Sequence, residues 1–167
     1  MKRREAKEKH EQSVLHSFEK YLLNKGVTLK IIGHPEPPDA LVNIDGKETW
    51  VEITDAFLNE ELARSISSYP ADDVPHIHTK RKLIIDPEQI YEGVVQDVVL
   101  AKYNKNAIRN VYKMYAQGIL LVGLFSPFVD IEDIEDLVLK IKIIKNGSDN
   151  RFGKIYLYDR DRNFHKI

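Results

Sequence analysis

Pro38 to Thr54 reads PDALVNIDGKETWVEIT, and this stretch decides the fold that the rest of the chain must complete. Asp45-Gly46 stands between two short alternating runs, and this dipeptide tolerates the positive φ angles of a type I′ turn. A β-hairpin is therefore predicted. Counting outward from a two-residue loop places Asp39 opposite Glu52, and Thr54 projects from the same face. The opposite face is apolar and carries Ala40, Val42, Ile44, Val51 and Ile53.

Asp39 and Glu52 are two carboxylates on adjacent strands, and like charges at this separation repel each other. Keeping both ionised beside an apolar sheet requires a compensating cation, and a divalent metal ion is the natural candidate. In the plainer alternative, Asp39 only begins a strand and Glu52 faces water on a half-exposed hairpin. The spacing alone leaves both interpretations open.

Pro38-Asp39, a hairpin and then Glu52-Ile53-Thr54 resemble the signature of the PD-(D/E)xK nuclease superfamily. In that superfamily the Asp and the Glu hold Mg²⁺, and a Lys two residues after the Glu completes the site. Thr54 stands in place of this Lys, which resembles E-x-T variants whose Lys often comes from a neighbouring helix. The resemblance implies that Asp39, Glu52 and the carbonyl of Ile53 hold Mg²⁺ or Mn²⁺. It also implies that Glu11 joins the metal site or its water shell.

Residues 4–25 have a helical composition and end at a plausible stop signal, Asn24-Lys25-Gly26. One apolar stripe runs along this helix and contains Val14, Leu15, Phe18, Tyr21 and Leu22. Glu11 falls inside the stripe, so its carboxylate is expected to point toward whatever the helix packs on, where burial without a partner is costly. A frayed first turn with Glu11 in solvent is the alternative.

A second, long helix is predicted after Asp86-Pro87, which combines an Asp N-cap with Pro at the first helical position. Its predicted apolar stripe contains Ile90, Val94, Val98, Ala101, Ile108 and Tyr112. Lys105 falls in this stripe and Lys102 lies at its edge, although Lys is unusual on a buried face. The superfamily resemblance makes Lys105 the first candidate for the migrated Lys and Lys102 the second. Alternatively, the Lys stem packs and its ammonium reaches water, and a break near Asn104 or Asn106 would shift the stripe.

The remaining segments complete an α/β pattern. We expect strands at 27–32, 119–124 and 154–159, the last of the chain, and helices at 55–68 and from 130 to about 144. Alternating elements after a meander predict a mixed sheet with helices on both faces. This order resembles the restriction-endonuclease-like core over roughly residues 8 to 125. The length of 167 residues predicts a single domain over residues 1–167.

Composition limits the compartment and the partners. The chain has no cysteine, which excludes disulfides and thiolate metal sites, and it has no apolar run that could span a bilayer. We therefore expect a cytoplasmic protein without a membrane partner. The net charge of -1 argues against a generic nucleic-acid coat, but Lys80-Arg81-Lys82 is a basic cluster suited to phosphates, or simply a solvated surface. His76-Ile77-His78 could chelate a transition metal, although no third ligand is near in sequence.

With these features, the resemblance implies a Mg²⁺- or Mn²⁺-dependent endonuclease that hydrolyses phosphodiester bonds of DNA. The resemblance implies a catalytic set of Asp39, Glu52, Thr54, Lys105 and Lys102. The alternative is a non-catalytic module of the same fold that binds nucleic acid or a partner protein, which Thr54 and the modest net charge favour. Cutting both strands of a duplex would suit a homodimer, although no segment of the sequence marks an interface.

Overall fold

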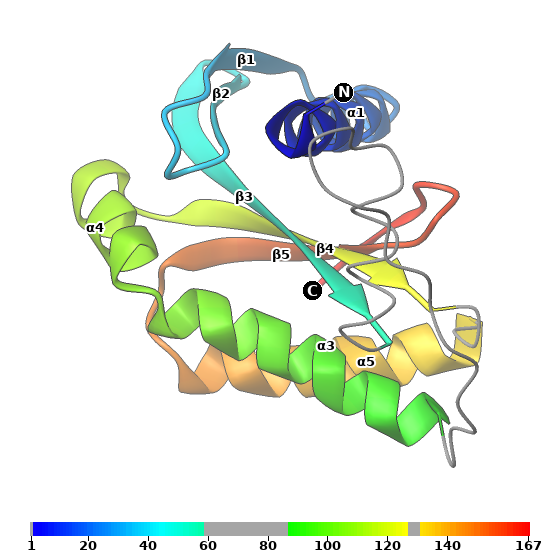
Figure 1. The fold of residues 1–167 in the computed structure, drawn as a ribbon. Coiled ribbons are helices and arrows are strands. Elements are labelled where there is room, and N and C mark those ends of the chain that lie inside the picture. The colour runs from blue at the N-terminus through cyan, green and yellow to red at the C-terminus, as the bar shows by residue number, and fades with distance from the viewer. Residues whose placement is uncertain (1, 59–86, 127–130) are drawn as a thin grey trace.

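The computed structural model describes residues 2–58, 87–126 and 131–167, which form one six-stranded mixed sheet with helices on both faces (Figure 1). The helices of this described part are α1 (Arg3–Leu23), α3 (Pro87–Asn104), α4 (Asn106–Tyr115) and α5 (Ile131–Gly147). The strands are β1 (Leu29–Gly33), β2 (Ala40–Ile44), β3 (Lys47–Phe57), β4 (Gly118–Phe125), β5 (Phe152–Tyr158) and β6 (Phe164–Lys166). The predicted α/β class and mixed sheet are confirmed.

The strands lie side by side in the order of the sequence, from β1 to β6. β1, β2 and β3 are antiparallel, β3, β4 and β5 are parallel, and β6 returns antiparallel to β5. The hairpin has the predicted register, with Ile44 opposite Lys47 and Leu41 opposite Trp50. The long strand β3 changes neighbours along its length, because β2 pairs with it only up to Val51 and β4 pairs with it from Val51 onward. β2 and β4 thus lie on opposite sides of β3 and overlap only at Val51, a position that we call the fork.

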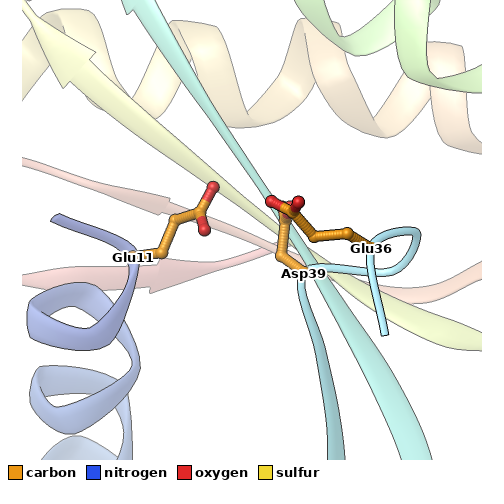
Figure 2. A group of neighbouring side chains, drawn as sticks. All are labelled: Glu11, Glu36 and Asp39. Atoms are coloured by element: carbon orange, nitrogen blue, oxygen red, sulfur yellow. The ribbon is translucent and has the colours of Figure 1, made fainter. Parts of the chain in front are cut away.

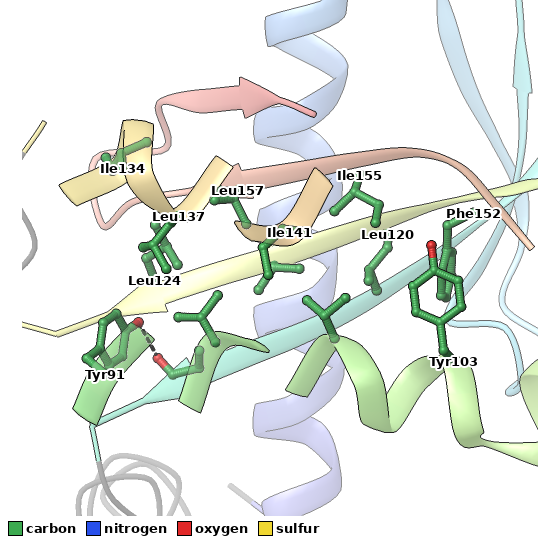
Figure 3. Packing of buried hydrophobic residues seen from close by; sticks show 14 of the residues in the cluster. Tyr91, Tyr103, Leu120, Leu124, Ile134, Leu137, Ile141, Phe152, Ile155 and Leu157 are labelled. Atoms are coloured by element: carbon green, nitrogen blue, oxygen red, sulfur yellow. Dashed lines mark hydrogen bonds between the residues drawn. The ribbon is translucent and has the colours of Figure 1, made fainter. Parts of the chain in front are cut away.

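Two apolar cores cover the two faces of the sheet. α1 packs on one face through Val14, Leu15 and Phe18, and all three are fully buried, as the predicted stripe requires. α3 and α5 pack on the other face around Trp50, Leu120 and neighbouring residues, part of which Figure 3 shows. The central strand β4 is buried along its length up to Leu124, which confirms the prediction from its continuous apolar run.

The predicted long helix is broken at Lys105, which has an extended backbone between α3 and α4. The predicted stripe is confirmed in part: Ile108 is buried, and Val94, Val98 and Tyr112 pack against the core. Within α3, however, Tyr91, Val95 and Val99 are the fully buried positions, while Ile90 is 48% exposed. Tyr91 also donates a hydrogen bond of 2.8 Å to the carbonyl of Ala56 on β3, which fixes the start of α3 on the sheet (Figure 3).

Three further boundaries differ from the sequence prediction. β3 continues through Phe57, so the helix expected from residue 55 does not begin there; the parallel ladder with β4 holds these residues extended, with Asp55 opposite Gly123. Residues 59–68 of that expected helix lie outside the described residues. α5 continues through Gly147, and the short strand β6 follows the strand that was expected to be the last. None of the helices in the described ranges combines the length and apolar composition needed to cross a membrane.

Candidate functional site

Asp39 directly precedes β2 and lies at the fork. Its side chain is buried, and its Oδ2 accepts a hydrogen bond of 2.7 Å from the backbone amide of Ile53. This hydrogen bond connects Asp39 to β3 at Ile53, two residues beyond Val51, where the pairing of β2 with β3 ends. Burial, reinforced by the charge of Glu52, raises the pKa of Asp39 to about 6. Asp39 is therefore a carboxylate held in a place where a nearby cation would stabilise its ionised form.

Glu11, Glu36 and Asp39 form a group of carboxylates whose nearest oxygens lie within 4.8 Å of one another. Figure 2 shows Glu11 extending from α1 toward Asp39 and Glu36, which come from the connector before β2. Glu11 is only 8% exposed, so the predicted inward orientation is confirmed and the frayed alternative is wrong. Glu36 is exposed and was not predicted, because a proline-rich connector has no periodicity that would show where its side chain points.

The Lys7 ammonium lies among these three carboxylates. Its Nζ is 2.8 Å from Glu36 Oε1, 3.2 Å from Glu11 Oε1 and 3.9 Å from Asp39 Oδ1. Although burial works in the opposite sense, hydrogen bonds to Glu36 and Glu11 raise the pKa of Lys7 above its usual value. The same contact with Lys7 lowers the pKa of Glu36, whereas burial raises that of Glu11. Lys7 thus pairs with Glu36 and Glu11 and lies near Asp39, whose ionised form Lys102 also favours, at a position that a metal ion would also favour.

Glu52 extends from β3 toward α3, and its charge adds to the effect of burial in raising the pKa of Asp39 and of Glu11. It is 2% exposed, and its Oε1 accepts a hydrogen bond of 2.6 Å from Lys102 Nζ. The other oxygen, Oε2, is also buried and has no hydrogen-bond partner among the residues that the structure describes. A buried carboxylate oxygen without a partner is costly, so Oε2 is a position where a further donor or a cation would lower the free energy.

Arg151 holds the end of α3 that carries Lys102. Its side chain is 1% exposed and donates to the backbone carbonyls of Lys102 and Lys105, at 3.2 and 3.3 Å. Asp149 Oδ2 lies 2.8 Å from the guanidinium and compensates its charge. Carbonyls at a helix end need such donors, so Arg151 fixes both the break at Lys105 and the place of Lys102. Arg151 was not identified from the sequence, since nothing local marks a contact across nearly fifty residues.

The structure therefore brings together Glu11, Asp39, Glu52, Ile53 and Lys102 of the predicted site, but not Lys105. Lys105, the first candidate, is exposed at the start of α4, whereas Lys102, the second, pairs with Glu52. Thr54 is half-buried on β3, opposite Val122. The basic cluster Lys80, Arg81 and Lys82, and the pair His76 and His78, lie outside the described residues.

A second polar cluster lies beyond the fork, on the α1 face. His10 Nε2 is 2.8 Å from Asp55 Oδ2, and Tyr158 donates a hydrogen bond of 2.7 Å to Asp55 Oδ1. Gly123 makes room for this contact, because a Cβ at that position would lie 2.4 Å from Asp55 Oδ1 and 2.7 Å from the Tyr158 hydroxyl. Sequence reasoning missed this cluster; the one available signal was a glycine inside an apolar strand, which indicates close approach.

Comparison of the chain with protein-family models, curated proteins and solved structures found no match. The chemistry of the site follows from its own groups. When Glu11, Glu36, Asp39, Glu52, Lys7 and Lys102 are all ionised, four carboxylates face two ammonium groups, which leaves two net negative charges. Carboxylate oxygens are the ligands that hard divalent cations prefer. The arrangement can thus hold such a cation at the fork of the sheet.

Proposed function

We propose that this chain is a metal-dependent nuclease with the restriction-endonuclease-like fold of the PD-(D/E)xK superfamily, and that it hydrolyses phosphodiester bonds of DNA. The observation that carries the proposal is the state of Glu52. This carboxylate is almost fully buried, pairs through one oxygen with a lysine from a neighbouring helix and keeps its other oxygen without a partner in the described part of the chain. It lies on the strand next to Asp39, as the E-x-T signature requires.

The residues present fit Mg²⁺ or Mn²⁺. Asp39, Glu52 and the carbonyl of Ile53 would hold the ion, with Glu11 as a further ligand or as the anchor of a coordinated water, and all of these donors are oxygens. The unpartnered Oε2 of Glu52 supports this assignment, because a coordinated cation would satisfy it. When bound, such an ion polarises a scissile phosphate and lowers the pKa of a coordinated water.

Lys102 takes the role that the superfamily gives to its lysine. Its ammonium, 2.6 Å from Glu52, would stabilise the negative charge that develops on the phosphate or orient the attacking water. Thr54 projects from the same strand face as Glu52 and offers only a hydrogen bond to the same region. Lys105 is the less suitable candidate, because it is exposed at the start of α4.

The alternative is a non-catalytic module of the same fold that binds nucleic acid or a partner protein. One observation favours it: besides the Lys-to-Thr change at position 54, both acidic groups already have ammonium partners within the chain, Lys7 on one face and Lys102 on the other. A protein of this kind would keep its ligand when divalent cations are chelated, whereas the nuclease requires them for turnover.

Calorimetric titration with Mn²⁺ distinguishes these functions. Glu52→Gln removes the charge of Glu52 and keeps its shape, so one-site binding by the wild type should be lost or weakened at least ~10-fold, because even changes to the partners of metal ligands cost roughly 10- to 100-fold in affinity. Glu48→Gln makes the same change at an exposed position of the same strand and should bind like the wild type. The titration is repeated with DNA present, because a substrate phosphate can supply a missing ligand.

Cleavage assays with plasmid and single-stranded DNA complete the test. Asp39→Ala and Glu52→Ala should abolish Mn²⁺-dependent cleavage, while circular dichroism shows that the fold is retained. Undiminished cleavage by both variants would exclude this site as the catalytic centre. DNA binding that survives chelation, without cleavage under any of these conditions, would identify the non-catalytic module.

A further inference from the structure

A hollow of about 420 Å³ opens between the C-terminal half of α1 and the turn that joins β5 to β6. We call it the α1–β6 groove and define it by Lys20, Tyr21 and Asn24 on one side and by Arg162, Asn163 and Phe164 on the other. The aromatic rings of Tyr21 and Phe164, 5.2 Å apart, lie at the junction of the two sides. Ser17, one turn before Tyr21, completes the lining.

The polar groups of the groove favour an anion. Its two charged side chains, Lys20 and Arg162, are both cationic, and neither forms an ion pair with a carboxylate of the described residues. Asp159 and Asp161 belong to the same turn but do not line the groove, and Asp159 accepts both the amide and the side-chain hydrogen bonds of Asn163. Two unpaired cations beside an amide side chain are a suitable environment for a phosphate.

Arg162 is anchored so that its charge stays at the groove. Its guanidinium carbon lies 5.1 Å from the centre of the Tyr158 ring, in the geometry of a cation–π contact. The end of α1 could oppose an anion through its free carbonyls. However, the carbonyls of residues 20, 22 and 23 already accept hydrogen bonds from backbone amides of residues 24–27, so the positive charge of Lys20 and Arg162 dominates.

The groove and the carboxylate site share one helix. Glu11 and Lys20 are nine residues apart on α1, which corresponds to about 14 Å along the helix axis. A helix makes one turn in about 3.6 residues, so nine residues also bring Lys20 to the side of α1 opposite Glu11. The groove is therefore a surface separate from the carboxylate site, although both lie on α1.

We propose that the α1–β6 groove binds a backbone phosphate of a nucleic-acid strand, outside the carboxylate site. The choice of a strand as the source of the phosphate rests on the proposed function. The groove itself is formed by residues that do not belong to the carboxylate site. Its binding is therefore measured without cleavage and without a metal ion.

The test is the affinity for a short fluorescein-labelled single-stranded oligodeoxynucleotide, measured by anisotropy in EDTA at several salt concentrations. Lys20→Gln/Arg162→Gln should bind roughly tenfold or more weakly and should reduce the salt slope by about one to two. Lys47→Gln/Lys113→Gln removes the same charge at two exposed positions outside the groove and should stay within about twofold of the wild type. Lys20→Gln alone gives the same comparison if the double variant unfolds.

An equal loss in both double variants, or no loss in either, would overturn the proposal. Displacement of the oligonucleotide by inorganic phosphate at an equal concentration would also overturn it, because the groove would then select the free ion and not a strand. Asp39→Asn/Glu52→Gln keeps the groove intact and should keep its contribution to binding. A chain that binds through the groove but never cleaves DNA would thus support this proposal while contradicting the nuclease.

Discussion

The two faces of the sheet compensate their buried acids in different ways. On the α3 face, Glu52 and Lys102 form a one-to-one pair in which the side chains are 3% and 17% exposed. On the α1 face, Lys7 is 57% exposed and is shared by Glu11, Glu36 and Asp39. A buried pair is strongly interdependent because neither charge can turn to water, whereas an exposed ammonium can be replaced by solvent or another cation. The α3 face thus makes the fold depend on both members of its pair, while the α1 face leaves its acids open to exchange.

The largest effect is expected from Lys102→Met, which keeps most of the aliphatic stem and removes the charge. Glu52 would be left buried and uncompensated, so we expect the free energy of unfolding to fall by about 3 to 5 kcal/mol. Urea denaturation measures the change. Glu52→Gln/Lys102→Met should recover much of the loss, since the double variant buries no isolated charge. A single variant as stable as the wild type would show that this pair does not differ from the exposed one.

Asp39 gives the α1 face a characteristic dependence on pH. Its pKa in the folded chain is about 6, compared with an ordinary value of 3.8, so the folded state binds the proton more tightly. Its contribution to stability is therefore greatest below about pH 4 and declines until the pH exceeds about 6. The decline is at most about 3 kcal/mol, because one pKa unit corresponds to about 1.4 kcal/mol.

Denaturation without metal at several pH values tests this contribution. Asp39→Asn cannot ionise but can still accept from the amide of Ile53, so its stability relative to the wild type should rise between about pH 4 and pH 6. Asp97→Asn, at an exposed position of α3, should show no such trend. Parallel pH profiles for the wild type and Asp39→Asn would mean that Asp39 has no raised pKa in the folded protein.

Gly123→Ala tests how tightly the α1 face is packed around Asp55. The added methyl would lie 2.4 Å from Asp55 Oδ1 and 2.6 Å from the Phe125 ring, so these side chains and Tyr158 must shift. We expect a loss of about 2 kcal/mol, within the usual range for overpacking. Gly93→Ala in α3 is the matched control, since its Cβ meets no atom within 4 Å and alanine favours a helix. Equal melting temperatures for the two variants would contradict this packing.

Local patterns in the sequence were sufficient to predict the hairpin and Glu11. The register from Ile44–Lys47 to Ala40–Val51 follows from a two-residue turn and the period of a strand, and the burial of Glu11 follows from its position in the α1 stripe. The preference for Lys105 over Lys102 was not supported, because the break in the helix depends on Arg151, far away in the sequence. Glu36 was missed because its position depends on the path of an irregular connector. A contact from a distant residue places Lys102, and an irregular connector places Glu36, so neither position follows from a local sequence pattern.

Lys7→Met separates stability from binding on the α1 face. The Lys7 side chain is more than half exposed, so its loss should change the free energy of unfolding by about 1 kcal/mol or less. Its ammonium occupies the space among the oxygens of Glu11, Glu36 and Asp39, and a divalent cation at those oxygens would have to displace it. We therefore expect Lys7→Met to bind Mn²⁺ more tightly than the wild type in calorimetric titration.

The direction of this last change distinguishes the two ways of compensating charge. Lys9→Met removes an equal charge from an exposed position of α1, so it lowers the general repulsion between the surface and a cation without removing the ammonium that lies among the carboxylates. Tighter Mn²⁺ binding by Lys7→Met but not by Lys9→Met would show that Lys7 competes directly for the acidic group. An equal gain in Mn²⁺ affinity in both variants would mean that only the net charge of the surface matters. Weaker binding by Lys7→Met alone would mean that this lysine organises the carboxylates, as Lys102 organises Glu52, and the contrast between the faces would fail.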